Sequence, residues 1–399
     1  MSTMEHIHYL AEEIGPRGST RSQEEKAARY AGDTLRAAGL EPITEPFTSA
    51  RSAWLPYTLA FGLILVGVVL FWIGGEWGTV TALVITGVVL ASVLLELAFR
   101  PNPLRWVLPK GESQNVWTRV EPGGDVREQV VVLAHLDSHR TPLVFSTDAW
   151  VGLFSVLIPV GLASVVILAG LLVAGLFWPR PLWQILSLPP GVVILAICLL
   201  TLQADRSPYT VGANDNASGV GVTLSLARRL AEHPLEHTQV WFVLSGCEEV
   251  GCYGADSFVQ ARGDDLVGPI WLTIDTVGGR GADPTWLEQE TFLLTARSDA
   301  DLLTLADGIA RHHPDLRARA TAFRGAYTEG AIGAKHGFRV LTLVALPQEG
   351  ALPHWHRASD MVGNVDADVV ARSREFVWEL LREIDRAQHD RRPVDGQAT

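Results

Sequence analysis

Histidine, aspartate and glutamate side chains follow apolar runs at several points of this 399-residue chain. The runs and the side chains after them are 129–134 with His135 and Asp137, 238–245 with Glu248 and Glu249, and 269–275, which ends in Asp275. Open α/β sheets place their sites at the carboxyl ends of strands, so we expect these side chains to converge. Histidine nitrogens mixed with carboxylate oxygens suit zinc, with cobalt or manganese as alternatives.

Two further motifs can contribute to the same site. Asp215 lies in GANDNASG, where it opens a helix. It could bridge two cations, or it could be a helix N-cap, a position that favours Asp and Asn. His356 lies in ALPHWHRASD, and a single histidine there is also compatible with an ordinary surface loop.

The adjacent carboxylates of Glu248 and Glu249 follow a buried strand. Two carboxylates in such a place lose hydration unless a cation offsets the loss. Two other glutamate pairs lie in amphipathic segments, and we interpret them as solvated helix faces. These pairs are Glu12-Glu13 and Glu24-Glu25.

The combined donor set is too large for one structural metal site. It fits a two-metal hydrolytic centre, with ions about 3.5–4 Å apart and one carboxylate left as base. The chain has three cysteines, too few for a disulfide scaffold: Cys198, Cys247 and Cys252.

Strands and helices that alternate along the chain must hold these residues. Strand-like runs recur at 129–134, 238–245, 269–275, 291–296 and 339–345. Helical spacing is found at 4–14, 22–40, 217–231, 254–262, 298–312 and 366–388. This alternation predicts an α/β domain with a largely parallel sheet.

Four uncharged stretches interrupt this pattern and explain why only 19% of the residues are charged. They are 52–75, 77–95, 149–179 and 181–204. Each reaches the length of about 20 apolar residues that crosses a bilayer core. Short turns join them in pairs, so we predict two transmembrane hairpins in a cell membrane. Pro189-Pro190 shortens the clean helix of the fourth stretch, and a buried core helix is the alternative for all four.

Positive charges near the ends of these stretches are distributed unequally. The side of the long polar segments carries Arg51, Arg100, Arg105, Lys110, Arg140 and Arg206, whereas the other side carries Arg180. The positive-inside rule therefore places the polar segments in the cytoplasm. The first 50 residues are polar, so we expect no cleavable signal peptide. The net charge of -12 argues against nucleic acid as a partner.

The motifs AHLDS, GANDNASG, CEEVGCYGADSF, IDTVG and WHRASD, in this order, resemble the di-zinc aminopeptidase family. That family includes aminopeptidase S, aminopeptidase Y and bacterial leucyl aminopeptidase, and is related to glutamate carboxypeptidase. The resemblance implies a three-layer zinc-exopeptidase fold with a mixed, largely parallel sheet and two inserted hairpins. The predicted organisation is: 1–50, N-terminal helices of the peptidase domain; 51–106, first transmembrane hairpin; 107–148, first metal motif; 149–204, second hairpin; 205–388, remaining metal motifs; 389–399, flexible tail.

The resemblance also implies two zinc ions per chain and a role for each site residue. The implied ligands are His135 and Asp275 for one ion, Glu249 and His356 for the other, and Asp215 as the bridge. Glu248 would be the general base, and Asp137 would hold the His135 ring in its ligating tautomer. We predict that five other histidines do not bind metal: His139, His312, His313, His336 and His354.

This chain departs from the family pattern on the substrate side. Trp355 stands where the family often has tyrosine, an oxyanion donor, and Arg357 stands where threonine is common. Glu329 lies where the family usually has an aspartate-containing loop. It is a candidate for the substrate pocket, with a helix-start carboxylate as the alternative.

We therefore expect a membrane-anchored metallo-aminopeptidase that hydrolyses the N-terminal bonds of peptides or proteins. Alternatives in the superfamily are a carboxypeptidase, a deacylase or a glutaminyl cyclase. A non-catalytic membrane scaffold is disfavoured because every ligand position and the base are filled. A transporter is disfavoured because the four stretches carry no charged residue inside them apart from Glu96 near one end, whereas transport sites usually need polar groups within the membrane. The oligomeric state stays open.

Overall fold

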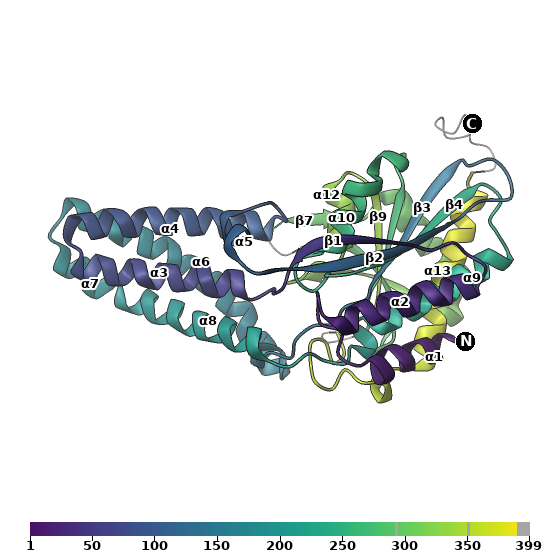
Figure 1. The fold of residues 1–399 in the computed structure, drawn as a ribbon, viewed down its shortest axis with the longest axis horizontal. Coiled ribbons are helices and arrows are strands. Elements are labelled where there is room, and N and C mark those ends of the chain that lie inside the picture. Colours follow the sequence, from purple (N-terminus) through teal and green to yellow (C-terminus); the bar gives the residue numbers. More distant parts are fainter. Residues whose placement is uncertain (292–293, 349–351, 389–399) are drawn as a thin grey trace. The chain divides into compact units, whose positions relative to one another are not determined.

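The computed structural model describes residues 1–291, 294–348 and 352–388, and the chain forms two units (Figure 1). The sheet unit comprises Met1–Arg51, Lys110–His139 and the described chain from Tyr209 onward. The helical unit comprises Ser52–Pro109 and Arg140–Pro208. The predicted tail, 389–399, lies outside the described residues.

A nine-stranded mixed sheet forms the centre of the sheet unit. Its strand order is β1-β2-β4-β3-β5-β9-β6-β7, and β8 pairs with β6. The strands are β1 Ile43–Ala50, β2 Lys110–Val120, β3 Glu128–His135, β4 Thr238–Ser245, β5 Ile270–Ile274, β6 Asp283–Thr291, β7 Thr295–Arg297, β8 Arg319–Arg324 and β9 Arg339–Leu346.

The strands β4, β3, β5 and β9 pair in parallel at the centre of the sheet. In this register His135, the last residue of β3, pairs with Ser245, the last residue of β4. The strands β3, β4 and β5 are buried on both faces, which explains their continuous apolar sequences. Four of the predicted strands are confirmed, and their carboxyl ends meet at one edge, as expected.

The fifth predicted strand, 291–296, is wrong. Thr291 is the last residue of β6, which begins at Asp283, and Thr295 is the first residue of β7. These two strands pair antiparallel, so they are not one continuous strand, and 292–293 lie outside the described residues. Pro284 and the charged residues of β6 break the alternation of apolar residues that predicts a strand. The strands β1, β2 and β8 were also not predicted, because polar and charged residues interrupt the apolar residues of each.

Helices cover both faces of the sheet. Alternate residues of β3 and β4, such as Val132 and Phe242, join the core with α2, α9 and α13. The residues between them face the other way, where the Trp241 ring meets the Phe258 ring of α10 at 6.1 Å. The helices of this unit are α1 Thr3–His8, α2 Ser22–Ala37, α9 Gly219–Glu232, α10 Tyr253–Arg262, α11 Ala300–His312, α12 Gly330–Lys335 and α13 Ala367–Arg386. The predicted three-layer α/β fold is confirmed.

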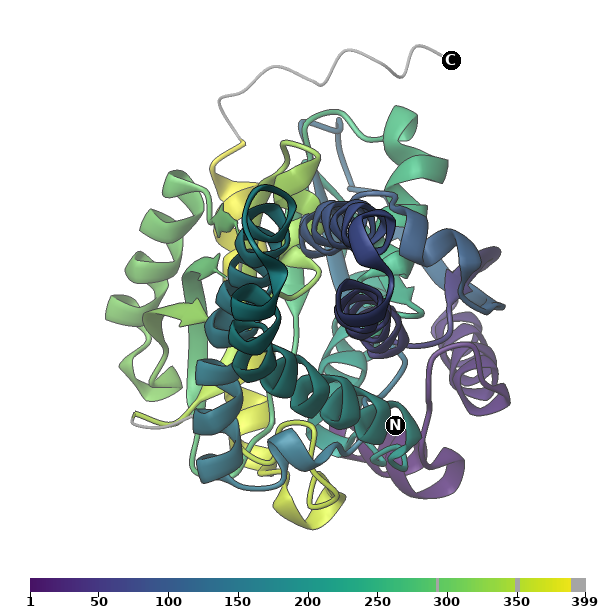
Figure 2. The same cartoon turned by 90° about the vertical axis from the view of Figure 1, so that its left-hand side faces the viewer.

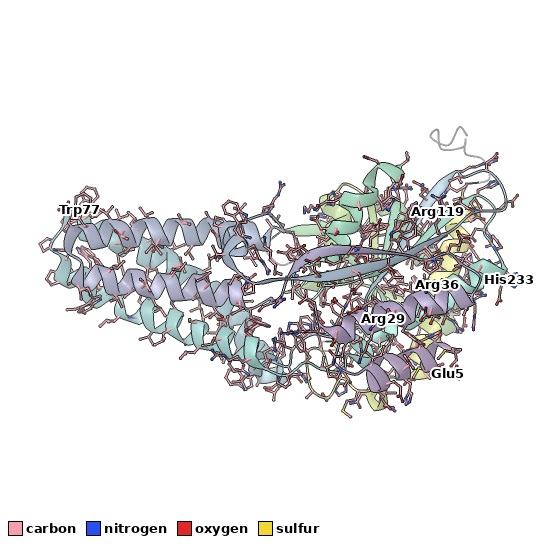
Figure 3. All side chains as sticks on the ribbon, in the orientation of Figure 1. Glu5, Arg29, Arg36, Trp77, Arg119 and His233 are labelled. Atoms are coloured by element: carbon pink, nitrogen blue, oxygen red, sulfur yellow. The ribbon has the colours of Figure 1, made fainter. Side chains whose placement is uncertain are left out.

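The helical unit contains four spans that are long and apolar enough to cross a membrane. They are α3 Leu55–Ile73, α4 Gly75–Leu97, α6 Asp148–Phe177, and α7 Arg180–Leu186 followed by α8 Leu188–Arg206. The short helix α5, Pro103–Val107, follows α4. Within the unit α3 packs against α4 and α8, and α6 also packs against both (Figures 1 and 2). Side chains along α3 and α4 are mostly carbon, and Trp77 lies at one end of α4 (Figure 3).

Candidate metal centre

The carboxylate of Asp215 lies between two imidazole rings that come from distant parts of the sequence. Its Oδ1 atom is 3.2 Å from Nε2 of His135, and its Oδ2 atom is 3.3 Å from Nε2 of His356. Asp215 lies in the loop before α9, His135 ends β3, and His356 lies in the loop after β9. One carboxylate that presents one oxygen to each histidine has the geometry of a bridging ligand.

Further carboxylates approach each histidine. Asp275, which follows β5, places Oδ1 3.6 Å from Nε2 of His135. Glu249, which follows β4, places Oε2 3.4 Å from Nε2 of His356. Donor atoms of His135 also cluster with those of Glu248 and Glu249. The structure therefore brings together all six predicted ligand and base residues, while their roles remain predictions.

The buried carboxylates of this cluster would be stabilised by a cation. Burial, together with the neighbouring carboxylates, raises the pKa values of Glu248 and Glu249 well above their usual range. Although burial opposes it, contact with two imidazoles lowers the pKa of Asp215. Oε1 of Glu249 and Oδ1 of Asp275 are buried and make no well-directed hydrogen bond. Divalent cations would neutralise the carboxylates and occupy these oxygens, so the donor set fits zinc.

Asp137 connects the ends of two neighbouring strands. Nδ1 of the His135 ring lies 3.2 Å from the backbone oxygen of Asp137 and 3.4 Å from its Oδ1. The Asp137 carboxylate also accepts hydrogen bonds from the backbone N–H groups of Glu248 and Glu249, at 3.1 and 3.2 Å. The Ser19 hydroxyl donates a third, at 2.6 Å. Asp137 therefore holds the turn that carries Glu248 as well as the ring of His135.

Glu24 is a buried part of the site, so its interpretation as part of a solvated helix face is wrong. Its carboxylate accepts hydrogen bonds from the backbone N–H of Thr20 and Cys247 and from the Ser113 hydroxyl. Burial and the nearby Asp137 raise its pKa to about 8. Glu25, its neighbour, is exposed as predicted and pairs with Arg29. Helical spacing alone does not reveal that Glu24 reaches under the turn before Glu248.

The role of Arg17 was also not predicted from the sequence. Its guanidinium is fully buried and donates to five backbone carbonyl oxygens. These belong to Leu10, Gly15, Leu136, Val211 and Gly212. Burial lowers its pKa to about 10, which leaves it charged at neutral pH. Arg17 thus joins the N-terminal helices to the loops that carry His135 and Asp215, and it adds a positive charge near their carboxylates.

Asp360 is a third buried residue that sequence reasoning did not identify. Its carboxylate accepts hydrogen bonds from the backbone N–H of Asn214, at 2.7 Å, and of Asp215, at 3.0 Å. Burial raises its pKa to about 7. Asp360 therefore fixes the backbone of the bridging carboxylate. The WHRASD motif contains this residue, but no spacing rule distinguishes it from a loop aspartate.

The two substrate-side candidates differ in their surroundings. Trp355 packs against the apolar cluster that contains Leu287, Val344 and Leu352, and its ring centroid lies 4.1 Å from that of His356. Glu329 is fully buried, and neither of its carboxylate oxygens makes a well-directed hydrogen bond. Burial raises its pKa to about 8, although the nearby His135 opposes that rise.

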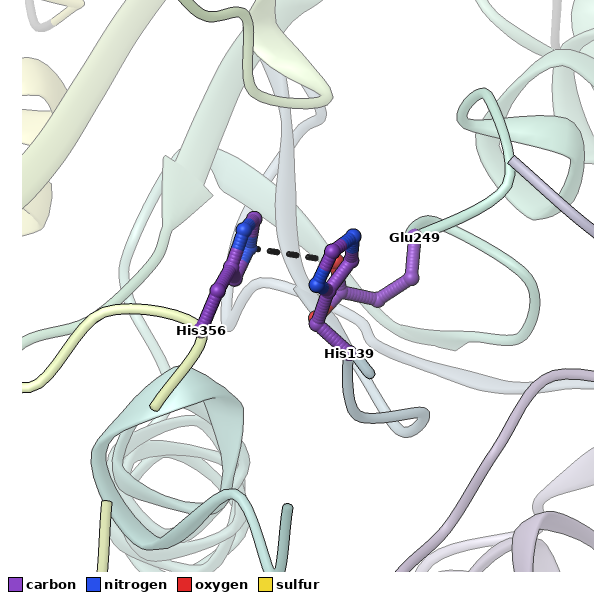
Figure 4. Close-up of side chains that lie close together, drawn as sticks. All are labelled: His139, Glu249 and His356. Atoms are coloured by element: carbon purple, nitrogen blue, oxygen red, sulfur yellow. Dashed lines mark ion pairs between the residues drawn. The ribbon is translucent and has the colours of Figure 1, made fainter. Parts of the chain in front are cut away.

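His139 lies beside Glu249 and His356, although we predicted from the sequence that it is not a metal ligand. Its ring stacks on His356 with a centroid distance of 3.6 Å, and Glu249 lies next to both (Figure 4). His354 instead places Nδ1 2.8 Å from the Ser359 hydroxyl. His312 lies on the exposed side of α11 and contacts the Gly308 carbonyl.

Comparisons with known proteins agree with this geometry. Residues 199–381 match Peptidase family M28. Over this segment, which is slightly less than half of the chain, the protein is similar to that family. Aminopeptidase YwaD of Bacillus subtilis is 28% identical over 134 residues, which are 29% of this chain and 29% of that protein. The match thus spans less than a third of that relative's length.

Solved structures share the fold over most of the chain. The zinc aminopeptidase BSAP from Bacillus subtilis has a TM-score of 0.55 at 14% identity, covering 96% of this chain and 94% of that one. The glutaminyl cyclase of Tannerella forsythia has a TM-score of 0.57 at 14% identity, covering 96% and 97%. The expected resemblance to the zinc aminopeptidase family is confirmed, and glutaminyl cyclases share the fold.

The role of Asp360 can be separated from its contribution to stability. Asp385 in α13 accepts the same kind of hydrogen-bond pair, from the backbone N–H of Glu236 and His237, at a place outside the candidate metal cluster. Asp360→Asn and Asp385→Asn should each lower the free energy of unfolding by about 1–3 kcal/mol, because each leaves a buried donor poorly satisfied.

We expect only Asp360→Asn to weaken zinc binding, by about 10- to 100-fold, as measured by competition with a chelator. Equal zinc affinities in the two variants would show that Asp360 does not position Asp215.

Proposed function

We propose that the protein is a membrane-anchored, zinc-dependent exopeptidase that acts as an aminopeptidase on peptide or protein N-termini. The observation that carries this proposal is the position of Asp215 between His135 and His356, with a further carboxylate beside each histidine. This arrangement provides two adjoining donor sets that share one carboxylate. Glu248 lies in the same cluster and is left over as a base.

The proposed ligands follow from these contacts. His135 and Asp275 would hold one zinc ion, Glu249 and His356 the other, and Asp215 would hold both. When bound, such ions supply Lewis acidity and lower the pKa of a water molecule. Glu248 removes a proton from the attacking water and later donates it to the leaving amine.

Glu248 is suited to this proton transfer by its surroundings. Its carboxylate is buried, and the Cys252 thiol lies 3.4 Å from its Oε1 atom. Burial raises the pKa of Glu248, whereas the charge of His135 opposes that rise. A raised pKa makes this carboxylate a stronger acceptor for the proton of the attacking water.

Glu329 is the proposed recognition group for the free amino terminus. Burial raises the pKa of its carboxylate, His135 opposes that rise, and the nearby Asp137 and Asp275 add to it. A substrate ammonium would supply the missing counter-charge. Trp355 is proposed to shape the pocket beside His356, because its ring packs in an apolar cluster.

The membrane part of the proposal rests on the four long apolar helices. We assign residues 51–106 and 149–204 to two transmembrane hairpins and the remaining segments, 1–50, 107–148 and 205–388, to the peptidase domain. The cationic side chains near the polar segments favour a cytoplasmic peptidase domain. Arg105 contributes little to this bias, because its guanidinium is buried and paired with Glu96.

A glutaminyl cyclase is the second candidate function. The glutaminyl cyclase of Tannerella forsythia has the same fold at a TM-score similar to that of the aminopeptidase. Cyclisation needs a residue that transfers protons, and Glu248 could serve either reaction. The two functions differ in their products and in the number of metal ions that each requires.

Glu248→Gln tests the proposed base. The amide keeps the shape of the side chain but cannot accept the proton, so kcat should fall by about 10²- to 10⁴-fold with little change in bound zinc. Glu13→Gln, at an exposed position of the N-terminal segment, is the matched control. Hydrolysis of a leucyl peptide at the wild-type rate by Glu248→Gln would exclude Glu248 as the base.

Product analysis of the full-length protein in detergent separates the two candidate functions. With peptides that begin in Leu or Gln, an aminopeptidase releases the free first amino acid and should hold about two zinc ions per chain. An N-acetylated copy of each peptide should be left intact. Ammonia and a pyroglutamyl product, with one zinc ion per chain, would instead identify a cyclase.

Impermeant thiol labelling in intact cells tests the membrane orientation. His233→Cys places a thiol on the exposed surface of the sheet unit, and Glu76→Cys places one in the first turn of α4, at the end of the first hairpin where α3 and α4 are joined. We expect labelling of Glu76→Cys in intact cells and of His233→Cys after permeabilisation. The wild-type chain is the blank, and the reverse pattern would contradict the cytoplasmic placement.

A further inference from the structure

The imidazole of His356 has a ring near each of its two faces. The His139 ring is nearly parallel to it, with an angle of 15° between the planes and 3.6 Å between the centroids. The Trp355 ring is tilted by 30°, with 4.1 Å between the centroids. Figure 4 shows the His139 and His356 rings face to face, with Glu249 beside them.

These distances place His139 and Trp355 on opposite faces of His356. A ring centroid at such a short distance must lie over a face, because a neighbour in the plane of the ring would overlap its atoms. Two rings over the same face at these distances would overlap each other. The His356 ring is therefore held between two aromatic rings.

The backbone that carries His139 is firmly fixed. Its carbonyl oxygen accepts a hydrogen bond from the Thr210 N–H at 2.9 Å, and the preceding Ser138 N–H donates to the Arg17 carbonyl at 3.1 Å. The Ser138 hydroxyl donates to the Thr210 carbonyl at 2.9 Å. His139 itself is 6% exposed. Its ring can therefore act as a rigid surface for another side chain.

The stacked geometry argues against His139 and His356 as joint ligands of one ion. Two imidazoles that bind the same zinc ion, each at about 2.0–2.1 Å, direct their nitrogens at one point, so their rings diverge from it. Rings that lie face to face direct their lone pairs side by side instead. A ring nitrogen of His139 therefore lies close to the donor atoms of Glu249 and His356, but its lone pair does not point to the place where an ion bound by His356 would lie.

We propose that His139 is a positioning residue for the second metal position. Its ring, with that of Trp355, holds the His356 imidazole in the orientation in which Nε2 faces both Asp215 and Glu249. This inference rests on the proposed function, because it requires His356 to bind metal. A ring that is fixed before the ion arrives loses less rotational freedom on binding, which raises the affinity of the second position.

Cobalt binding to the full-length, metal-depleted protein tests this role. Absorption spectra and chelator competition report the affinity and the coordination of each ion without reference to activity. The variants are His139→Ala and His139→Leu, which remove the aromatic surface, and His139→Phe, which keeps it but removes the nitrogens. His312→Ala, on the exposed side of α11, is the matched control.

We expect His139→Ala and His139→Leu to weaken the second cobalt ion by about 10-fold or more and to leave the first unchanged. His139→Phe should restore the affinity and the wild-type spectrum. If His139→Phe loses the second ion and its spectral bands as His139→Ala does, then His139 is a ligand and the positioning role is wrong.

Unchanged affinity in both His139→Ala and His139→Leu would also overturn the inference. A wild-type protein that binds a single cobalt ion would instead refute the two-metal site in the proposed function, and with it this inference. The leucine variant fills the volume that alanine leaves empty. A loss confined to alanine, with normal binding in the leucine variant, would assign the effect to packing and contradict stacking.

Discussion

The burial of several carboxylates at one edge of the sheet is the constraint on which the rest of the structure depends. Carboxylates that are out of water repel one another unless positive charge or hydrogen-bond donors compensate. The fold supplies backbone N–H groups to Asp137, Asp360 and Glu24. It also supplies the buried charge of Arg17. Asp215, Asp275 and Glu249 have less compensation of this kind, which supports the proposal that they are the carboxylates that bind metal.

The sequence predicted that His135, Glu249 and Asp275 converge because parallel strands end at one edge. The strands β3, β4 and β5 are continuous apolar runs, so the polar residues directly after them had to converge. The supporting residues carry no such signal. Glu24 has the spacing of a helix surface, and Arg17 follows a Gly-Pro break. Their burial arises from contacts more than 100 residues away in sequence, such as Glu24 with Cys247 and Arg17 with Leu136.

The second long insertion separates His135 from Asp215 in sequence, yet the site geometry is retained. Within the sheet unit, the Thr210 N–H donates to the His139 carbonyl, which joins the two chain ends that flank the insertion. Within the helical unit, the Thr141 N–H donates to the Pro208 carbonyl in the same way. Each unit thus closes its own chain ends, and an insertion between adjacent ends costs little loop entropy. This explains how His135 and Asp215 meet in one site although the second insertion lies between them in sequence.

Trp355, at the position where the resembled family often has tyrosine, has a physical consequence within the proposed reaction. Its indole packs in an apolar cluster and over His356, so the side chain contributes mainly surface contact at this position. Stabilisation of a developing oxyanion would then depend more on the metal ions than on a hydroxyl donor. The orientation of His356 becomes correspondingly more important, because an ion that is displaced loses both its ligand and its contact with the substrate carbonyl. The His139 ring, stacked on the other face of His356, would help to keep this ligand in place.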